Sequence, residues 1–381
     1  MLNKFLVILL FISCKFFAQD TLYARQIINK LTSKHCFGRG YVNNGLQNAE
    51  AIIIDEIKSY SCQPLFNGTF TQSFKHNVNT FSGKCDVKIN GKQLIAGVDY
   101  ILNPASNSAK GKFKLTKKDS AAYVSTDKNN SVLITKKNKL TFSVNDKVNS
   151  YCEIDLDKKR FTEEPKTIKI NIENKYIINF ESKNIGCFIN GTSNSDSVIV
   201  FSAHYDHLGG MGKDTYFPGA NDNASGVSVV LNLIKHYCKN APRYKTIFIF
   251  FAGEEAGLIG SKYFVEQKSI DLKKIKFLIN LDLLGTGDDG IMVTNGFVFQ
   301  KQFNILNDIN FYNNYVKEIK RRGKAANSDH YWFTEASVPS FFIYTLGGIT
   351  AYHDVFDVAK TLPLTDYVDV FTLLVKFVER L

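Results

Sequence analysis

Imidazole and carboxylate side chains recur in the second half of this sequence, each beside an apolar run that would bury it. Five of them stand out as candidate metal ligands: His204, Asp222, Glu255, Asp282 and His353. A buried charge needs a compensating charge, and few Lys or Arg residues lie near these five in the sequence. The pattern therefore predicts that metal ions hold the five side chains together.

The ligand types narrow the choice of metal. Imidazole nitrogen and carboxylate oxygen, without thiolate, are typical of zinc in a catalytic role. Five ligands are too many for one tetrahedral ion that keeps a position open for substrate, whereas two ions about 3.5–4 Å apart, bridged by one carboxylate, use all five. Two dications outweigh three carboxylates, so the site would stabilise hydroxide and a developing oxyanion. We therefore expect two Zn²⁺ per chain and hydrolytic chemistry.

The elements that must position these side chains are apolar strands alternating with helices. Strands are predicted at 198–201, 246–251, 277–281 and 340–344, and helices at about 224–239, 257–267, 299–320 and 365–380. Strands that are apolar on both faces and separated by helices favour an α/β fold with a mostly parallel or mixed central sheet, covered by helices on both faces. Sites in such sheets form at the carboxyl ends of strands. Four of the five candidates follow a predicted strand, and Asp222 precedes the first of these helices.

The first half of the chain has a different character. Residues 20–65 are predicted to be helical, because apolar residues recur there at helical spacing. Residues 66–180 favour short alternating strands, predicted at 112–116, 131–135, 139–144, 167–172 and 176–180, with Asn, Gly, Ser and Lys between them. This stretch also carries most of the net charge of +11. No nucleic-acid motif accompanies the charge, so we interpret it as a solvated surface and predict no nucleic-acid partner.

The N-terminus and the cysteines bear on localisation. A basic start and an apolar run at 5–12, too short to span a bilayer, predict a signal peptide cleaved near Ala18, and thus a secreted or periplasmic protein. A lipid anchor at Cys14 is the alternative. The six other cysteines show no CxxC spacing, and their even number permits disulfides in an exported chain. Cys36–Cys62 and Cys85–Cys152 are the first pairings to test.

The strings around the candidate ligands resemble those of a known family. They are Ala203-His204-Tyr205-Asp206-His207-Leu208-Gly209, Gly219-Ala220-Asn221-Asp222-Asn223-Ala224-Ser225-Gly226, Gly253-Glu254-Glu255-Ala256-Gly257-Leu258-Ile259-Gly260-Ser261, Asn280-Leu281-Asp282 and Tyr352-His353. In this order and with these gaps, residues 185–360 closely resemble the M28 family of metallopeptidases.

The resemblance implies a role for each ligand. His204 and Asp282 resemble the ligands of one zinc, Glu255 and His353 those of the other, and Asp222 the bridge between them. It also implies a non-proline cis peptide after Asp222.

The resemblance further implies that Glu254 is the general base, taking a proton from the water that the zinc pair activates and passing it to the leaving amine. Asp206 is placed to accept the second N–H of the His204 ring. Asp357 resembles the family's aspartate after the last ligand, and Tyr352 stands where some members carry a tyrosine that bonds the tetrahedral intermediate. His207 is predicted to have a supporting role.

The predicted function is a secreted zinc aminopeptidase that acts on peptides or proteins. The predicted organisation is a signal peptide at 1–18, an N-terminal helical part of the catalytic domain at 19–82, a β-rich insert at 83–165 and the zinc peptidase core at 166–381. The insert stands where family members often carry a protease-associated domain, and it is a reduced or divergent version of one in this interpretation.

Two other functions compete with this prediction. Glutaminyl-peptide cyclotransferases share the fold but use one zinc. Tyr352 stands where they usually have Trp, and Asn327-Ser328 where they usually have acidic residues. A non-enzymatic binding module is disfavoured because all five ligand positions and Glu254 are present. The sequence contains no later apolar run long enough to cross a membrane.

Overall fold

The computed structural model describes residues 21–127 and 131–381. The predicted signal peptide at 1–18, which includes Cys14, lies outside these residues. In the described part of the chain, no helix combines the length and the apolar character needed to cross a bilayer.

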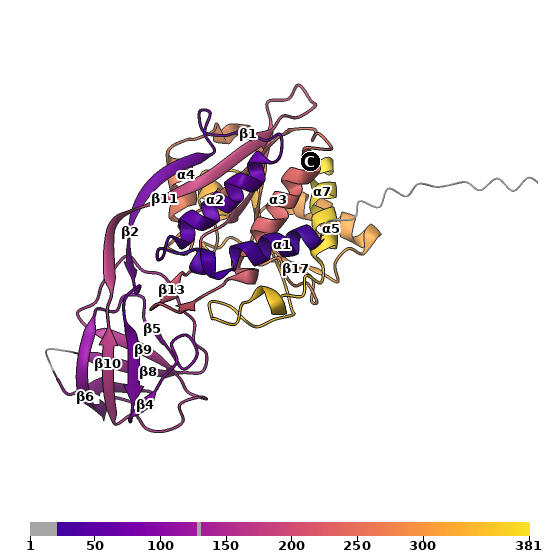
Figure 1. The fold of residues 1–381 in the computed structure, drawn as a ribbon. Coiled ribbons are helices and arrows are strands. Elements are labelled where there is room, and N and C mark those ends of the chain that lie inside the picture. Colours follow the sequence, from indigo (N-terminus) through magenta and orange to yellow (C-terminus); the bar gives the residue numbers. More distant parts are fainter. Residues whose placement is uncertain (1–20, 128–130) are drawn as a thin grey trace, which may run out of the picture.

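A large mixed sheet forms the centre of the molecule (Figure 1). In the described residues its strand order is β1 (Gln63–Pro64), β11 (Lys175–Ile189), β15 (Lys245–Phe251), β12 (Val198–His204), β16 (Ile275–Leu281), β19 (Ser340–Thr345), β17 (Ile291–Thr294) and β18 (Ile319–Arg321), with β2 (Thr71–Thr80) also paired to β11. The central strands β15, β12, β16 and β19 are parallel, whereas β11 and β17 join them antiparallel. The predicted mixed sheet is confirmed, and the four predicted core strands lie at its centre.

Helices cover both faces of this sheet, as predicted. One face packs against α1 (Thr21–Leu31), α2 (Gly45–Lys58), α3 (Gly226–Tyr237), α5 (Gln300–Asn313) and α7 (Tyr367–Arg380), and the other against α4 (Ile259–Glu266) and α6 (His330–Glu335). Along β12 the side chains alternate between the two cores, with Phe201 in the first and Val200 in the second. This alternation is why the strand is apolar at every position.

The helix predicted at 299–320 is too long. In the structure, α5 ends at Asn313 and residues Ile319–Arg321 form the edge strand β18. Asn314 adopts a left-handed conformation with φ of 52°, which Asn tolerates better than most residues and which ends the helix.

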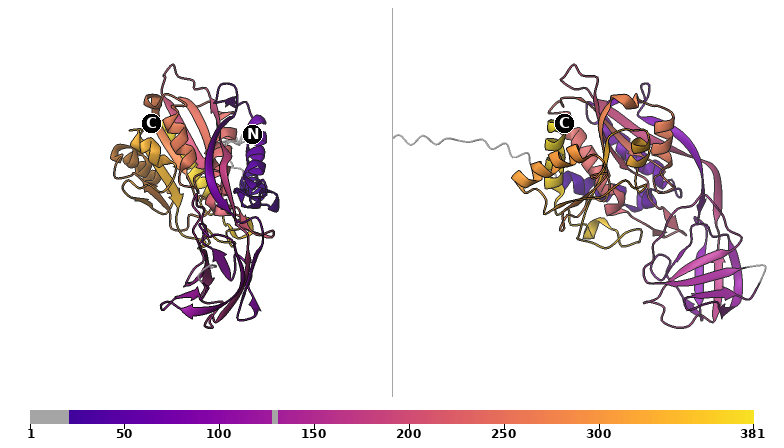
Figure 2. Two further views of the ribbon diagram at one scale, coloured as in Figure 1. Left: turned by 90° about the vertical axis from the view of Figure 1, so that its left-hand side faces the viewer. Right: turned by 180° about the vertical axis from the view of Figure 1, so that it is seen from behind.

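A second sheet stands apart from the first, below the main body in every view (Figures 1 and 2). In the described residues its order is β4 (Lys92–Gln93), β3 (Cys85–Ile89), β10 (Thr167–Ile172), β6 (Ala109–Lys117), β7 (Ala122–Ser125), β8 (Val132–Lys137), β9 (Cys152–Asp157) and β5 (Tyr100–Leu102). We call this unit the β-domain. The chain enters it from β2 and returns through β11, which pair antiparallel as one ribbon. Strand β10 pairs with β3 and β6, so the β-domain extends past residue 165, where the prediction ended the insert.

Residues 139–144 were predicted to be a strand, and this prediction is wrong. No strand is assigned there, although Leu140 and Phe142 are buried in the core of the β-domain. The main chain of Phe142 instead donates to the carbonyl of His353, at 2.9 Å. The alternating apolar pattern correctly indicated which side chains are buried. The main-chain N–H of Phe142, however, bonds to a loop distant in the sequence and not to a neighbouring strand.

The six cysteines among the described residues are free thiols. The Cys36 thiol donates to the carbonyl of Lys30, at 3.4 Å, and the Cys62 sulfur lies 2.9 Å from that of Cys187. Neither of the pairings to test first is formed as a disulfide in this structure, and Cys62 lies beside Cys187 and not beside Cys36. Cys62 faces strand β11, a neighbour that its position in the sequence does not reveal.

Candidate metal centre and active site

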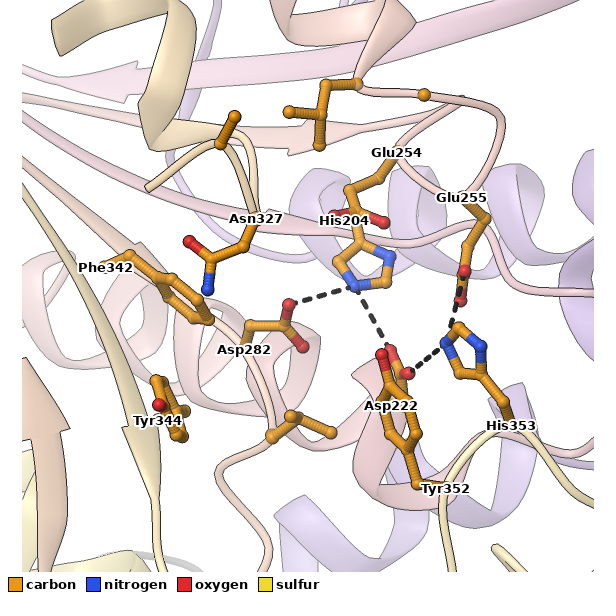
Figure 3. Close-up of a pocket in the computed structure, with 14 residues that line it drawn as sticks. His204, Asp222, Glu254, Glu255, Asp282, Asn327, Phe342, Tyr344, Tyr352 and His353 are labelled. Atoms are coloured by element: carbon orange, nitrogen blue, oxygen red, sulfur yellow. Dashed lines mark ion pairs between the residues drawn. The ribbon is translucent and has the colours of Figure 1, made fainter. Parts of the chain in front are cut away.

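The five candidate ligands converge at the carboxyl edge of the central sheet (Figure 3). His204 ends β12, Glu255 follows β15, and Asp282 follows β16 directly. Because these strands are parallel neighbours, their ends meet at one edge. Asp222 enters from the turn before α3, and His353 from the loop after β19. The cis peptide implied for Asp222–Asn223 is present.

The two carboxylate oxygens of Asp222 face two different sets of ligands. Its Oδ1 lies 3.3 Å from Nε2 of His204, which is also 3.4 Å from Oδ2 of Asp282. Its Oδ2 lies 3.0 Å from Nε2 of His353, which is also 3.3 Å from Oε2 of Glu255. We call these the His204 set and the His353 set. Asp222 is thus the one carboxylate that belongs to both.

The charges of the five side chains fit a site for cations. Burial alone would lower the pKa of His204, but the surrounding carboxylates, Asp282 first, raise it well above its usual range. Burial also lowers the pKa of His353, but Glu255 and Asp222 outweigh this effect and raise the pKa to about 9. The site therefore stabilises positive charge. Oδ1 of Asp282 is buried without a hydrogen-bond partner among the described residues, which leaves it free to bind an ion.

Glu254 lies beside the His204 set and lines the same pocket. Burial raises the pKa of its carboxyl group well above the usual range, and the carboxylates of Glu255 and Asp329 add to the rise while His204 opposes it. A carboxyl group with a raised pKa in a pocket is suited to accept a proton and release it again. The geometry is thus compatible with a general base.

Asp206 organises both glutamates. Its carboxylate accepts hydrogen bonds from the main-chain N–H of Glu254 and of Glu255, at 3.2 and 3.3 Å, and from the hydroxyl of Tyr41, at 3.0 Å. The His204 ring contacts Asp206 chiefly through the main-chain carbonyl, 3.2 Å from Nδ1, while the carboxylate is 3.7 Å away. Asp206 therefore orients the ring and the turn that carries the two glutamates.

Two further side chains support individual ligands. Nδ1 of His207, which is fully buried, lies 2.7 Å from Oε1 of Glu255, so that Oε2 is left to face His353. The hydroxyl of Ser328 donates to Oδ2 of Asp282 at 3.3 Å.

Asp357 holds the turn that carries Asp222. Its two carboxylate oxygens accept the main-chain N–H groups of Asn221 and Asp222, at 2.8 and 3.0 Å. Burial raises the pKa of Asp357 to about 6, and these two bonds counteract the rise. The aspartate singled out in the sequence thus acts on the backbone beside the shared carboxylate.

Arg39 is a residue that the sequence analysis missed. Its guanidinium is fully buried and donates to five main-chain carbonyls, those of Leu31, Tyr205, Pro218, Gly219 and Asp222, at 2.6–3.3 Å. It ties the turn before α3 to the end of β12. The signal was an arginine within an apolar and glycine-rich stretch, Cys36-Phe37-Gly38-Arg39-Gly40, but no spacing links it to residues some 180 positions away.

The pocket beside the ligands has a volume of about 410 Å³ and an apolar wall opposite the carboxylates. Phe342 and Tyr344 from β19 form this wall, and Asn327 lies near Phe342 (Figure 3). Leu258 and Leu283 also line the pocket. Tyr352 lines the pocket too, with its ring stacked on that of His353 at a centroid distance of 4.0 Å. The cavity can hold one amino-acid side chain next to the ligand cluster.

Known proteins share both the sequence pattern and the fold. Residues 184–378 match the family model described as Peptidase family M28. A curated relative, aminopeptidase YwaD of Bacillus subtilis (strain 168), is 32% identical over 158 residues, which cover 38% of this chain and 31% of that protein. The matched regions span 11% to 31% of the length of the first curated relatives.

Solved structures cover almost the whole chain. The structure of BSAP, a zinc aminopeptidase from Bacillus subtilis, has a TM-score of 0.69 at 17% identity and covers 95% of each chain. An Acidobacteriales bacterium glutaminyl cyclase has a TM-score of 0.57 at 15% identity, covering 95% of this chain and 94% of its own. At these identities the likeness shows the fold. Because the family model matches more than half of the sequence, including all five candidate ligands, the chain belongs to peptidase family M28.

Proposed function

We propose that the protein is an exported aminopeptidase that binds two zinc ions through the His204 and His353 sets and removes N-terminal residues from peptides. The observation that carries this proposal is the division of the Asp222 carboxylate, with one oxygen toward each set at 3.3 and 3.0 Å. Imidazole and carboxylate are the donors that catalytic zinc prefers. The export part of the proposal rests on residues 1–18.

The chain's own residues suggest how hydrolysis would proceed. When bound, a zinc pair would polarise the scissile carbonyl and activate a water for attack. Glu254 would take the proton of that water and deliver it to the leaving nitrogen. The hydroxyl of Tyr352, whose ring stacks on that of His353, would donate to the developing oxyanion.

The pocket supports action at the amino end of a peptide. Its acidic side would attract a free α-amino group, and its aromatic wall of Phe342 and Tyr344 would favour an apolar first side chain. A pocket of about 410 Å³ has room for a whole residue beside the ligand cluster.

Zinc counting and activity test the proposal together. Metal-free protein titrated with Zn²⁺ is expected to bind two ions per chain, and hydrolysis of leucine p-nitroanilide should vanish with a chelator and return with Zn²⁺. The N-acetylated anilide is the matched control and should not be cleaved. One zinc per chain together with cyclisation of N-terminal glutaminyl peptides would instead support the cyclotransferase alternative.

A further inference from the structure

Residues 139–144, the segment wrongly predicted to be a strand, join the β-domain to one of the candidate ligands. We call them the linking segment. Within it, the main-chain N–H of Phe142 donates to the carbonyl of His353 at 2.9 Å, and the carbonyl of Phe142 lies 3.1 Å from Nδ1 of the same histidine. Two hydrogen bonds therefore connect a residue of the insert region to a residue 211 positions later.

The second of these bonds fixes the state of the His353 ring. A main-chain carbonyl can only accept, so Nδ1 of His353 carries the hydrogen and donates it. In the neutral ring, the form that binds a metal, the lone pair is then on Nε2, the atom that faces Asp222 and Glu255. Such an outer partner sets both the orientation and the basicity of a ligating imidazole. The His204 ring is held differently, by Asp206 within the core, so the linking segment acts on the His353 set alone.

Lys139 strengthens the same connection. Its ammonium group donates to the carbonyl of Thr350 at 2.9 Å, lies 3.7 Å from Oδ2 of Asp354, and sits 5.9 Å from the centre of the Tyr352 ring. The loop that carries His353 is thus held on both sides of the histidine.

The linking segment is itself anchored in the β-domain. The Phe142 ring stacks on that of Phe217 with centroids 4.4 Å apart and an angle of 4° between their planes, and both rings are buried in the core of the β-domain. Val355, two residues after His353, packs against the same core. The position of the His353 loop therefore depends on the packing of the β-domain.

We propose that the β-domain positions the zinc ion of the His353 set, with Phe142 as the positioning residue. This inference rests on the proposed two-zinc function. It gives the insert a role at the metal centre, since loosening Phe142 releases the ring of one ligand and leaves the His204 set intact.

The test is a zinc titration of metal-free Phe142→Ala protein, read by competition with a chromophoric chelator. Phe142→Ala keeps the main-chain N–H and carbonyl of residue 142 but removes the ring that anchors them. We expect one of the two sites to weaken, by up to the roughly 10–100-fold that follows complete loss of an outer partner of a metal ligand, and the other to stay as in the wild type. Phe161→Ala is the matched control, because it removes a ring buried in the same core that does not contact His353. Phe142→Leu, which keeps the buried apolar volume, should restore most of the affinity.

The possible outcomes separate the two proposals. A wild-type protein with fewer than two zinc sites would overturn the two-zinc function and this inference with it. A wild-type protein with two sites that Phe142→Ala leaves unchanged, or that Phe161→Ala weakens equally, would overturn the inference alone. If Phe142→Ala does not fold, Lys139→Met tests the inference in its place, because Lys139 also holds the loop that carries His353. Selective weakening of one zinc site would support the inference, and two unchanged sites would refute it.

Discussion

Glu254→Gln is expected to lower kcat for an aminoacyl anilide by about 10²–10⁴-fold, the range for loss of a general base. Gln has nearly the shape of Glu but cannot accept the proton of the attacking water or return it to the leaving amine. Glu254 is not among the five candidate ligands, so the zinc content should equal that of the wild type, and KM should change little. Steady-state kinetics and elemental analysis of the same preparation measure both effects.

The neighbouring residue provides the control for this prediction. Glu255→Gln changes the adjacent carboxylate, whose Oε2 faces His353 at 3.3 Å, and should lose zinc along with activity. Both variants would then lose activity, but Glu254→Gln would keep its zinc and Glu255→Gln would not. Wild-type turnover in Glu254→Gln would show that another group takes the proton, and loss of zinc from it would reassign Glu254 as a ligand.

Arg39→Met is expected to destabilise the protein by about 3–5 kcal/mol, because it breaks a buried hydrogen-bond network in which several acceptors share one donor group. The five carbonyls that accept from Arg39 would remain buried without its donors, and an unsatisfied buried acceptor is costly. Arg39→Lys should recover little, because one ammonium group cannot replace a planar fork that reaches several carbonyls. Urea unfolding followed by circular dichroism measures the free energy of unfolding.

Arg25 offers a matched control for this experiment. It also donates to main-chain carbonyls, those of Ala359, Leu362 and Pro363, but it is partly exposed. Water can replace its bonds, so Arg25→Met should cost only about 0.5–1.5 kcal/mol. Equal costs for the two variants would mean that the burial of Arg39 does not matter.

Because Arg39 holds the turn that carries Asp222, Arg39→Met should also bind zinc more weakly than the wild type.

Much of the fold could be predicted because it depends on local burial. Strands such as 198–201 and 246–251 are apolar at every position, and only a sheet covered on both faces buries every side chain in this way. The helices between these strands make them parallel, and parallel strands bring their carboxyl ends to one edge. The sequence therefore predicted that His204, Glu255 and Asp282 would meet.

Other features depended on partners far away in the chain. Leu140 and Phe142 had the alternation of a strand, and both are buried, yet Phe142 bonds to His353 and not to a strand. The pattern of side chains reports which face is buried, but it does not report which backbone supplies the hydrogen bonds. The same reason explains why Cys62 lies beside Cys187 and not beside Cys36.

By itself, the sequence determined the family, the mixed α/β sheet and the chemical types of the residues at the strand ends. Only the tertiary structure decided that Asp222 divides its oxygens between two histidines, that Arg39 gathers five carbonyls and that Phe142 fixes the ring of His353. Side-chain type and local burial are written in short stretches of sequence. Which buried donor meets which acceptor across some 180 to 210 residues is determined by the packing of whole elements, because every buried polar group must find its partner in three dimensions.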